Sequence, residues 1–228
     1  MQVWMTRGGT GLLLVCLCVG RAGLASAEEA APAKLEVDAA KRTVSIPCKI
    51  AQRKLPNLPE VYPIEVIATY PAPKGQKAHE TVVTFDIKPS EIAQAIASLG
   101  LKPGKPAKGD AVPTGPELKV SLELPGPDGK PKVTPIEKLI VDRKTGKPMP
   151  TLKWYFTGSA MKQPDPEKDE KVYGADLTGT LIAIFPVTDD VVIQTNLTMK
   201  EEPLLKLETN KKALPEEGTP AKLIIQAK

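Results

Sequence analysis

Short segments in which apolar and polar residues alternate one by one constrain the fold of this chain more than any other feature. Residues 43–50 and 118–124 show the pattern most clearly: every second side chain is apolar. Such alternation over four to eight residues predicts half-buried β-strands. Further strands are expected over residues 34–38, 63–70, 78–87, 139–141, 152–159, 172–185, 191–195, 204–207 and 222–227.

One segment shows helical spacing instead. Ser90 is a suitable N-cap and Gly100 can close the helix. Between them, apolar residues recur at the i, i+3, i+4, i+7 positions of a buried helix face, namely Ile92, Ala95, Ile96 and Leu99. The capping-box spacing from Thr134 to Glu137 indicates one further helical turn.

Together these patterns predict an α+β, strand-rich fold, with mostly antiparallel sheet or sheets and one main amphipathic helix over about residues 90–99. Residues 102–117 are rich in Pro, Gly and Lys. They predict a long surface loop, or a linker between subdomains.

The start of the chain has the pattern of a secretory signal peptide. Arg7 precedes a short apolar run, and Ala25-Ser26-Ala27 has the small-x-small form of a cleavage site. A transmembrane anchor is the competing interpretation, but the run from Gly11 to Gly20 falls short of the ~20 residues that a span requires. We therefore expect cleavage after Ala27, a mature single domain over residues 28–228, no transmembrane segment in it, and a secreted or periplasmic location.

Cleavage would change both the charge and the cysteine content. Residues 1–27 hold two of the 31 basic and none of the 27 acidic side chains, so the balance falls from +4 to +2. Without a clustered basic stripe, no nucleic-acid partner is expected. Cys48 would be the only mature cysteine, which leaves no intrachain disulfide. It is expected to be a buried apolar residue, with a thiol link to another chain as the alternative.

The single histidine, His79, limits the chemistry that the chain can perform. Zinc catalysis uses two or three nitrogen or sulfur ligands, so no metal site and no cofactor are expected. His79 would also be the only base for a serine hydrolase, and no G-x-S-x-G elbow accompanies it. On a strand over residues 78–87, His79 faces the apolar side and Glu80 faces the other. The alternative to a functional site is that His79 has a structural role, as a hydrogen-bonded histidine at the edge of the core.

Two further segments carry polar residues in an otherwise apolar context. Asp176 would share the outer face of a strand with Thr178 and Thr180, and Gly179 indicates a bulge there. Thr157 and Ser159 would lie opposite the rings of Trp154 and Phe156. Each set is either a shallow binding site or the wet face of a sheet. Asn196-Leu197-Thr198 is a glycosylation sequon.

The order of several motifs resembles the YdjY-type domain of bacterial envelope proteins over roughly residues 35–227. The motifs are PIEVIATYPAPKGQKAHETVVT, SEIAQAIASLGLKPG, WYFTGS, YGADLTGTLIAIFP and LPEEGTP. The resemblance implies an envelope location and a single domain, and no particular activity. It also places His79, Glu80, Thr157, Gly158, Ser159 and Asp176 at recognisable motif positions. The cysteine runs of some relatives, associated with iron–sulfur clusters, are missing here.

The sequence thus favours a non-enzymatic binding or envelope-associated module, with an unidentified envelope or extracellular partner. The alternative is a hydrolase-like enzyme or an ion site centred on His79, Glu80 and Asp176, with Thr157 and Ser159 as further candidates.

Overall fold

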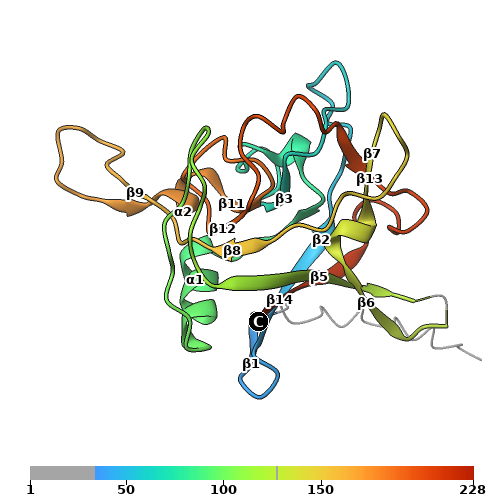
Figure 1. The fold of residues 1–228 in the computed structure, drawn as a ribbon, viewed down its shortest axis with the longest axis horizontal. Helices are drawn as coiled ribbons and strands as arrows, with labels where there is room; N and C mark the ends of the chain where they lie inside the picture. Colours follow the sequence, from blue (N-terminus) through green and yellow to red (C-terminus); the bar gives the residue numbers. More distant parts are fainter. Residues whose placement is uncertain (1–33, 127) are drawn as a thin grey trace, which may run out of the picture. The chain divides into compact units, whose positions relative to one another are not determined.

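The strands pair into one large sheet that closes on itself (Figure 1). The computed structural model describes residues 34–126 and 128–228, and residues 33–228 group into one compact unit. The expected signal segment, its cleavage after Ala27 and the first two cysteines lie outside the described residues.

Eight strands form the closed sheet, because β4 at the end of the order pairs back to β2. Six of the eight neighbouring pairs in the described chain are antiparallel; β11–β12 and β3–β4 are parallel. In sheet order the strands are β2 (Thr43–Ile50), β14 (Pro220–Ala227), β5 (Glu117–Pro125), β8 (Trp154–Phe156), β12 (Ile193–Thr195), β11 (Thr180–Ala183), β3 (Val66–Thr69) and β4 (Val83–Thr84).

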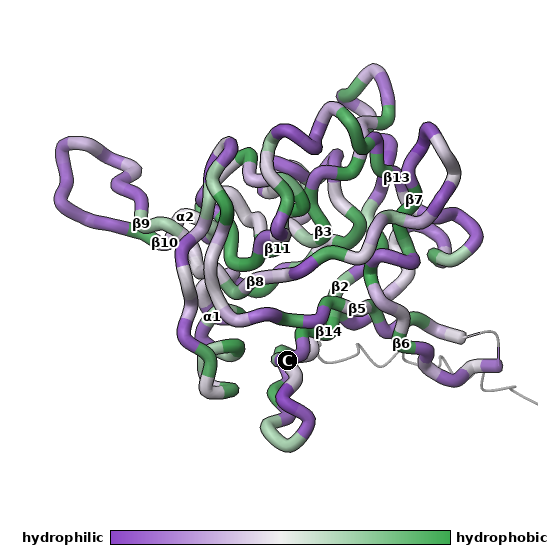
Figure 2. The backbone as a smooth tube through the Cα atoms, in the orientation of Figure 1, coloured by the Kyte–Doolittle hydropathy of each residue, from purple (hydrophilic) through white to green (hydrophobic). Residues whose placement is uncertain are grey.

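The remaining strands extend this sheet or form small ribbons. β1 (Glu36–Asp38) pairs with β2, and β6 (Pro131–Pro135) pairs with β5. β7 (Ile140–Asp142) pairs with β13 (Leu207–Thr209). β9 (Met161–Lys162) pairs with β10 (Val172–Tyr173), and the tube between them is hydrophilic (Figure 2).

The core lies inside the closed sheet. The inward side chains of β2, β5 and β14 alternate with outward polar ones, as period-two strands require. Trp154, Phe156 and Tyr70 are the largest rings among the fully buried side chains. Helix α1 (Pro89–Ser98) packs against β2 with its apolar stripe buried. The strand-rich α+β prediction is therefore confirmed.

Three predicted strands are wrong in part. Of residues 204–207, only Leu207 lies in a strand, β13, and Leu204 lies in a turn. The other two segments contain a turn or a helix. Residues 78–87 contain a 3₁₀ turn, η1 (Ala78–Glu80), before the two-residue strand β4. Residues 172–185 are broken by helix α2 (Gly174–Thr178), which ends at Gly179 with φ +71°. Glycine is required there because a Cβ would lie 2.2 Å from the Tyr70 ring. In both segments local backbone hydrogen bonds replace the expected ladder.

The helix prediction is confirmed, but its cap is not. Lys88 is the N-cap residue without a side-chain bond, and Pro89 occupies the first turn. Gly100 closes the helix as expected, with φ +85° and its N–H donated to Ala97 O. The 3₁₀ turn η2 (Ile136–Leu139) follows the Thr134 capping-box signal.

The loop over residues 102–117 is attached to the closed sheet. Gly104 N–H donates to Phe156 O at 2.9 Å. The buried Gln194 side chain accepts from Ala107 N–H at 2.8 Å and donates to Ala107 O at 2.9 Å. Because both contacts join the loop to strands of the same sheet, it belongs to that unit.

Candidate functional site

His79 and Glu80 lie side by side, because the turn η1 brings them together. The two residues do not point to opposite faces, as a strand would have required. His79 Nε2 is 3.3 Å from Glu80 Oε1, with 26% of the His79 side chain exposed and 10% of that of Glu80. The Tyr62 ring meets the imidazole edge to face at a centroid distance of 5.3 Å. A carboxylate that orients an imidazole is an arrangement found in general bases.

The Glu80 carboxylate has a second partner in Lys77. Lys77 Nζ lies 2.6 Å from Glu80 Oε2 and 2.8 Å from Glu65 Oε2. Burial tends to lower the pKa of Lys77, but the hydrogen bonds and charges of both carboxylates outweigh it and raise the pKa. Lys77 therefore stays charged and offsets much of the negative charge of the Glu80 carboxylate.

Arg53 fixes the backbone of the same turn. Only 7% of this residue is exposed. Its guanidinium donates to His79 O at 2.7 Å, to Tyr62 O and to Glu208 Oε1 at 3.0 Å. A buried charge needs such partners, and an arginine with three acceptors holds the segments that supply them in one position. We name Arg53, Tyr62, Glu65, Lys77, His79, Glu80 and Glu208 the Arg53 cluster.

The reasoning from sequence missed Arg53. Its one signal is its position: it follows the buried strand β2 by three residues, where a charged side chain remains close to the core.

Thr157 and Ser159 are bonded to the backbone on a different part of the sheet. Thr157 Oγ1 donates to Val192 O at 3.0 Å. Ser159 Oγ accepts from Ala175 N–H at 2.9 Å, in the first turn of α2, and donates to Ala160 O at 3.1 Å. Ser159 N–H donates to Tyr173 Oη at 3.0 Å. The hydroxyl of Ser159 thus acts as a cap, since it satisfies an N–H of the helix start.

Asp176 joins the two helices. Its Oδ1 accepts from Ser90 N–H at 2.8 Å and its Oδ2 from Ser90 Oγ at 2.7 Å. A carboxylate in this position satisfies a free N–H at the start of α1 and interacts well with the helix dipole. Ser90, the expected cap, is instead a donor to Asp176. Within the described residues, no hydrogen bond or ion pair joins Asp176 to His79.

The other residues singled out in the sequence also have defined positions. Cys48 faces the core, as predicted, and burial raises the pKa of its thiol to about 12. Asn196 is exposed, and its Oδ1 accepts from Lys153 N–H at 2.9 Å. In the part of the chain that is described, no group of three His, Cys, Asp or Glu side chains could hold a metal ion.

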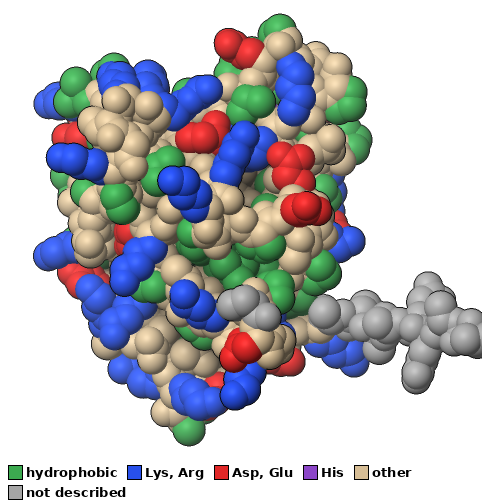
Figure 3. All heavy atoms as spheres, turned by 90° about the vertical axis from the view of Figure 1, so that its right-hand side faces the viewer, with side chains coloured by type: hydrophobic (Ala, Val, Ile, Leu, Met, Phe, Trp, Pro, Cys, Tyr) green, Lys and Arg blue, Asp and Glu red, His purple; other side chains and the backbone are tan. Residues whose placement is uncertain are grey.

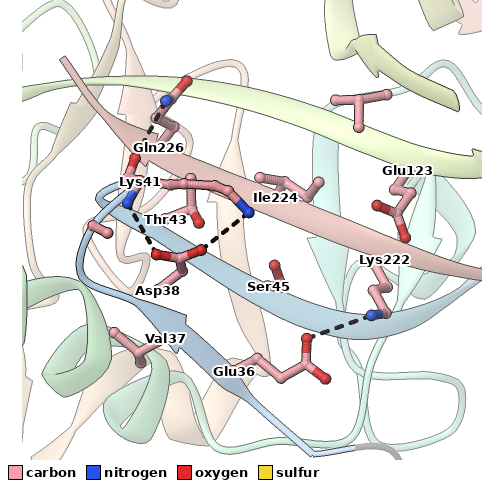
Figure 4. A pocket seen from close by; sticks show the side chains of 12 residues that line it. Glu36, Val37, Asp38, Lys41, Thr43, Ser45, Glu123, Lys222, Ile224 and Gln226 are labelled. Carbon is pink, nitrogen blue, oxygen red and sulfur yellow. Dashed lines mark hydrogen bonds and ion pairs between the residues drawn. The ribbon is translucent and has the colours of Figure 1, made fainter. Parts of the chain in front are cut away.

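A groove lies on the outer face of the sheet, away from all five candidate residues (Figure 4). It is lined by strands β1, β2, β14, β5 and β6 together with the turn after β1. The charged residues in it are Glu36, Asp38, Lys41, Glu123 and Lys222, and the apolar ones include Ile224 and Val133. Over the face in Figure 3, charged side chains of both signs surround a central apolar area.

The candidate residues therefore form two separate sets. His79 and Glu80 belong to the Arg53 cluster, whereas Thr157, Ser159 and Asp176 support the helices α1 and α2.

Among residues 34–126 and 128–228, no helix has the length and apolar character needed to cross a membrane.

Comparisons with curated proteins and with solved structures gave no match. A comparison with protein families matches residues 35–226 to the YdjY domain, which covers most of the chain and includes both sets of residues. The chain therefore belongs to the YdjY domain family.

Proposed function

We propose that the mature chain is a secreted or periplasmic, non-enzymatic module that binds an envelope or extracellular partner. One observation carries the proposal: the side-chain oxygens of Thr157, Ser159, Asp176 and Glu80 are used in contacts that hold the fold together. Asp176 and Ser159 bond the starts of α1 and α2, and Glu80 is neutralised by Lys77.

Among the described residues, no hydrogen bond joins the His79 imidazole to a hydroxyl or a thiol. Catalysis by the His79–Glu80 pair would need a hydroxyl, thiol or bound water within hydrogen-bond reach of the free imidazole nitrogen. The contacts of the imidazole among described residues are a carboxylate and the Tyr62 ring. The chain's only mature cysteine, Cys48, is buried and protonated at neutral pH.

A hydrolase centred on His79 and Glu80 is the second candidate function. It is favoured by the 3.3 Å contact between Nε2 and the carboxylate, and by the partial exposure of the imidazole. Asp176 takes no part in this version, since both of its oxygens bond Ser90.

Turnover assays separate the two functions. The full chain is incubated with p-nitrophenyl acetate, p-nitrophenyl phosphate and a fluorogenic peptide substrate, beside His79→Ala and Ser159→Ala. We expect no turnover above background from any of the three proteins. Turnover that disappears in His79→Ala, while circular dichroism and the unfolding midpoint remain unchanged, would show that the protein is an enzyme.

The location is tested by expressing the full chain in a bacterial host and sequencing the N-terminus of the product. The proposal expects a periplasmic protein that starts at Glu28. An uncleaved cytoplasmic product would contradict it.

A further inference from the structure

The outer groove arises from a pattern of side-chain sizes across five strands. On its central strand β14, Ile224 lies directly between Ser45 of β2 and Ser121 of β5. Longer charged side chains line the groove on the flanking strands, with Glu36 on β1 and Glu123 on β5. Because the two serines are short, they leave the Ile224 side chain accessible between them.

The floor of the groove is more apolar than an outward sheet face requires. Ile224 is only partly covered, although it occupies an outward position between Lys222 and Gln226. Val133 of β6, opposite Glu123, is 53% exposed. The two residues lie on either side of β5 and line the same groove. Exposed aliphatic groups in a groove mark a surface that gains from being covered.

The charges of the groove leave one carboxylate free. Lys41 pairs with Asp38 at 3.2 Å, and Lys222 pairs with Glu36 at 3.4 Å. Glu123 has no ion pair or hydrogen bond to any described residue, although it also lines the groove. Lys222 stands opposite Glu123 in the β14–β5 register, but its ion pair is with Glu36. A cationic group of a ligand would therefore meet Glu123 without first having to break an ion pair of that carboxylate.

We propose that the groove binds an extended polypeptide segment in which a Lys or Arg stands two residues from an aliphatic residue, so that both side chains point to the same side of the chain. The aliphatic side chain covers Ile224, and the cation faces Glu123 on the neighbouring strand β5. This assignment rests on the proposed binding function and names the chemistry of its partner. Among the described residues, no aromatic ring lines the groove, so they offer a sugar no surface on which to stack. The excess carboxylate disfavours nucleic acid and anionic lipid.

The dimensions of the sheet set the length of the segment. Adjacent strands lie about 4.8 Å apart, so the four spacings between β1 and β6 span roughly 19 Å. An extended chain covers that distance with about six residues, at about 3.3 Å per residue.

The test uses an arrayed library of fluorescent hexapeptides that place Lys, Arg, Glu or Ser two positions before Leu or Ser, with Ser between them. Binding to the full chain is measured by fluorescence polarisation at low and high salt. Soluble peptidoglycan fragments and vesicles of anionic phospholipid serve as competing probes. We expect peptides with Lys-Ser-Leu or Arg-Ser-Leu to bind best, and to bind more weakly at high salt.

Two groove variants and two matched controls locate the binding. Glu123→Gln should weaken binding by up to about fivefold, because an exposed ion pair contributes no more than about 1 kcal/mol. Ile224→Ser should weaken it by at least about tenfold, because apolar cover is lost. Glu167→Gln, between β9 and β10, and Val112→Ser, in the loop over residues 102–117, make the same chemical changes outside the groove and should leave binding unchanged.

Each other outcome overturns the inference. Absence of peptide binding, preference for acidic peptides, equal effects in the control variants, or groove-dependent binding of vesicles or peptidoglycan fragments would each do so. These results concern the groove alone, whereas the proposed function fails through turnover that depends on His79. The two failures are therefore distinguishable.

Discussion

Removal of the Asp176 carboxylate should destabilise the fold, because this group bonds the start of α1. In Asp176→Ala the N–H of Ser90 loses its 2.8 Å acceptor and the Ser90 hydroxyl its 2.7 Å acceptor. Loss of a capping side chain costs about 1–2 kcal/mol. Loss of a negative charge at a helix N-terminus adds about 0.5 kcal/mol.

The expected decrease in the free energy of unfolding is therefore about 2 kcal/mol. For a domain of this size it corresponds to a melting temperature lower by about 4–8 °C. Asp176→Asn keeps one oxygen acceptor but loses the charge, so its decrease should be about half as large.

A double-mutant cycle with Ser90→Ala isolates the contact. Urea unfolding of the wild type, both single variants and the double variant should give a coupling free energy of about 1 kcal/mol, as for residues in direct contact. Asp169→Ala, an exposed carboxylate between β9 and β10, is the matched control and should change the stability by less than about 0.5 kcal/mol.

Two results would refute the reasoning. A stable Asp176→Ala protein with no coupling to Ser90 would mean that the hydrogen bonds do not support the helix. A stable variant that had also lost a measurable turnover would make Asp176 a chemical group rather than a cap.

Three further predictions concern Arg53, Glu208 and Cys48. Arg53→Met should lower the free energy of unfolding by about 2–3 kcal/mol, since His79 O, Tyr62 O and the partly buried Glu208 carboxylate each lose a donor. Equilibrium unfolding should show this loss, and Arg53→Met/Glu208→Gln should recover part of it. Burial raises the pKa of Glu208, but hydrogen bonds from Arg53 and the charge of its guanidinium outweigh this and keep the pKa below its ordinary value. A depressed folded-state pKa contributes stability above the unfolded value near 4.3, and that stability is lost as the pH falls through the folded value. The stability difference between the wild type and Glu208→Gln should therefore narrow below about pH 4, and an unchanged difference would contradict the pairing. Cys48 should react with iodoacetamide at pH 8 only after unfolding, because burial raises the pKa of its thiol to about 12; rapid labelling of the folded protein, read by mass spectrometry, would place this residue elsewhere.

The sequence was sufficient to predict the longest strands. In residues 43–50, 118–124 and 222–227, burial of every second side chain is a local pattern, and the structure has strands at all three places. The pattern does not encode which strands pair, so the return of the sheet from β4 to β2 could not be inferred.

The turn at His79 and the helix at Asp176 were not predicted, and the reason is the same for both. Both are short, and their conformations depend on partners distant in the sequence. Arg53 bonds His79 O from 26 residues away, and Ser159 bonds the Ala175 N–H from 16 residues away. Local alternation continues through both segments and therefore favoured strands.

The groove did leave a signal in the sequence. Lys222 and Gln226 are polar at outward positions of β14, yet Ile224 between them is aliphatic. A single break in the outward half of the pattern does not distinguish a binding surface from a chance exposure. Only the structure adds that Ser45 and Ser121 flank Ile224 and that Val133 of β6 pairs with Glu123 of β5.

Residues that support the fold and residues that line the groove should respond differently to substitution. Asp176, Ser159 and Arg53 satisfy backbone groups where the chain leaves its strands, so each change there exposes unpaired donors or acceptors and lowers stability. Glu123 and Ile224 face the solvent and satisfy nothing inside the protein. Substitutions there should leave the unfolding midpoint nearly unchanged and alter only binding. Stability and binding measured on the same variants therefore separate the residues that stabilise the YdjY domain from the residues that bind its partner.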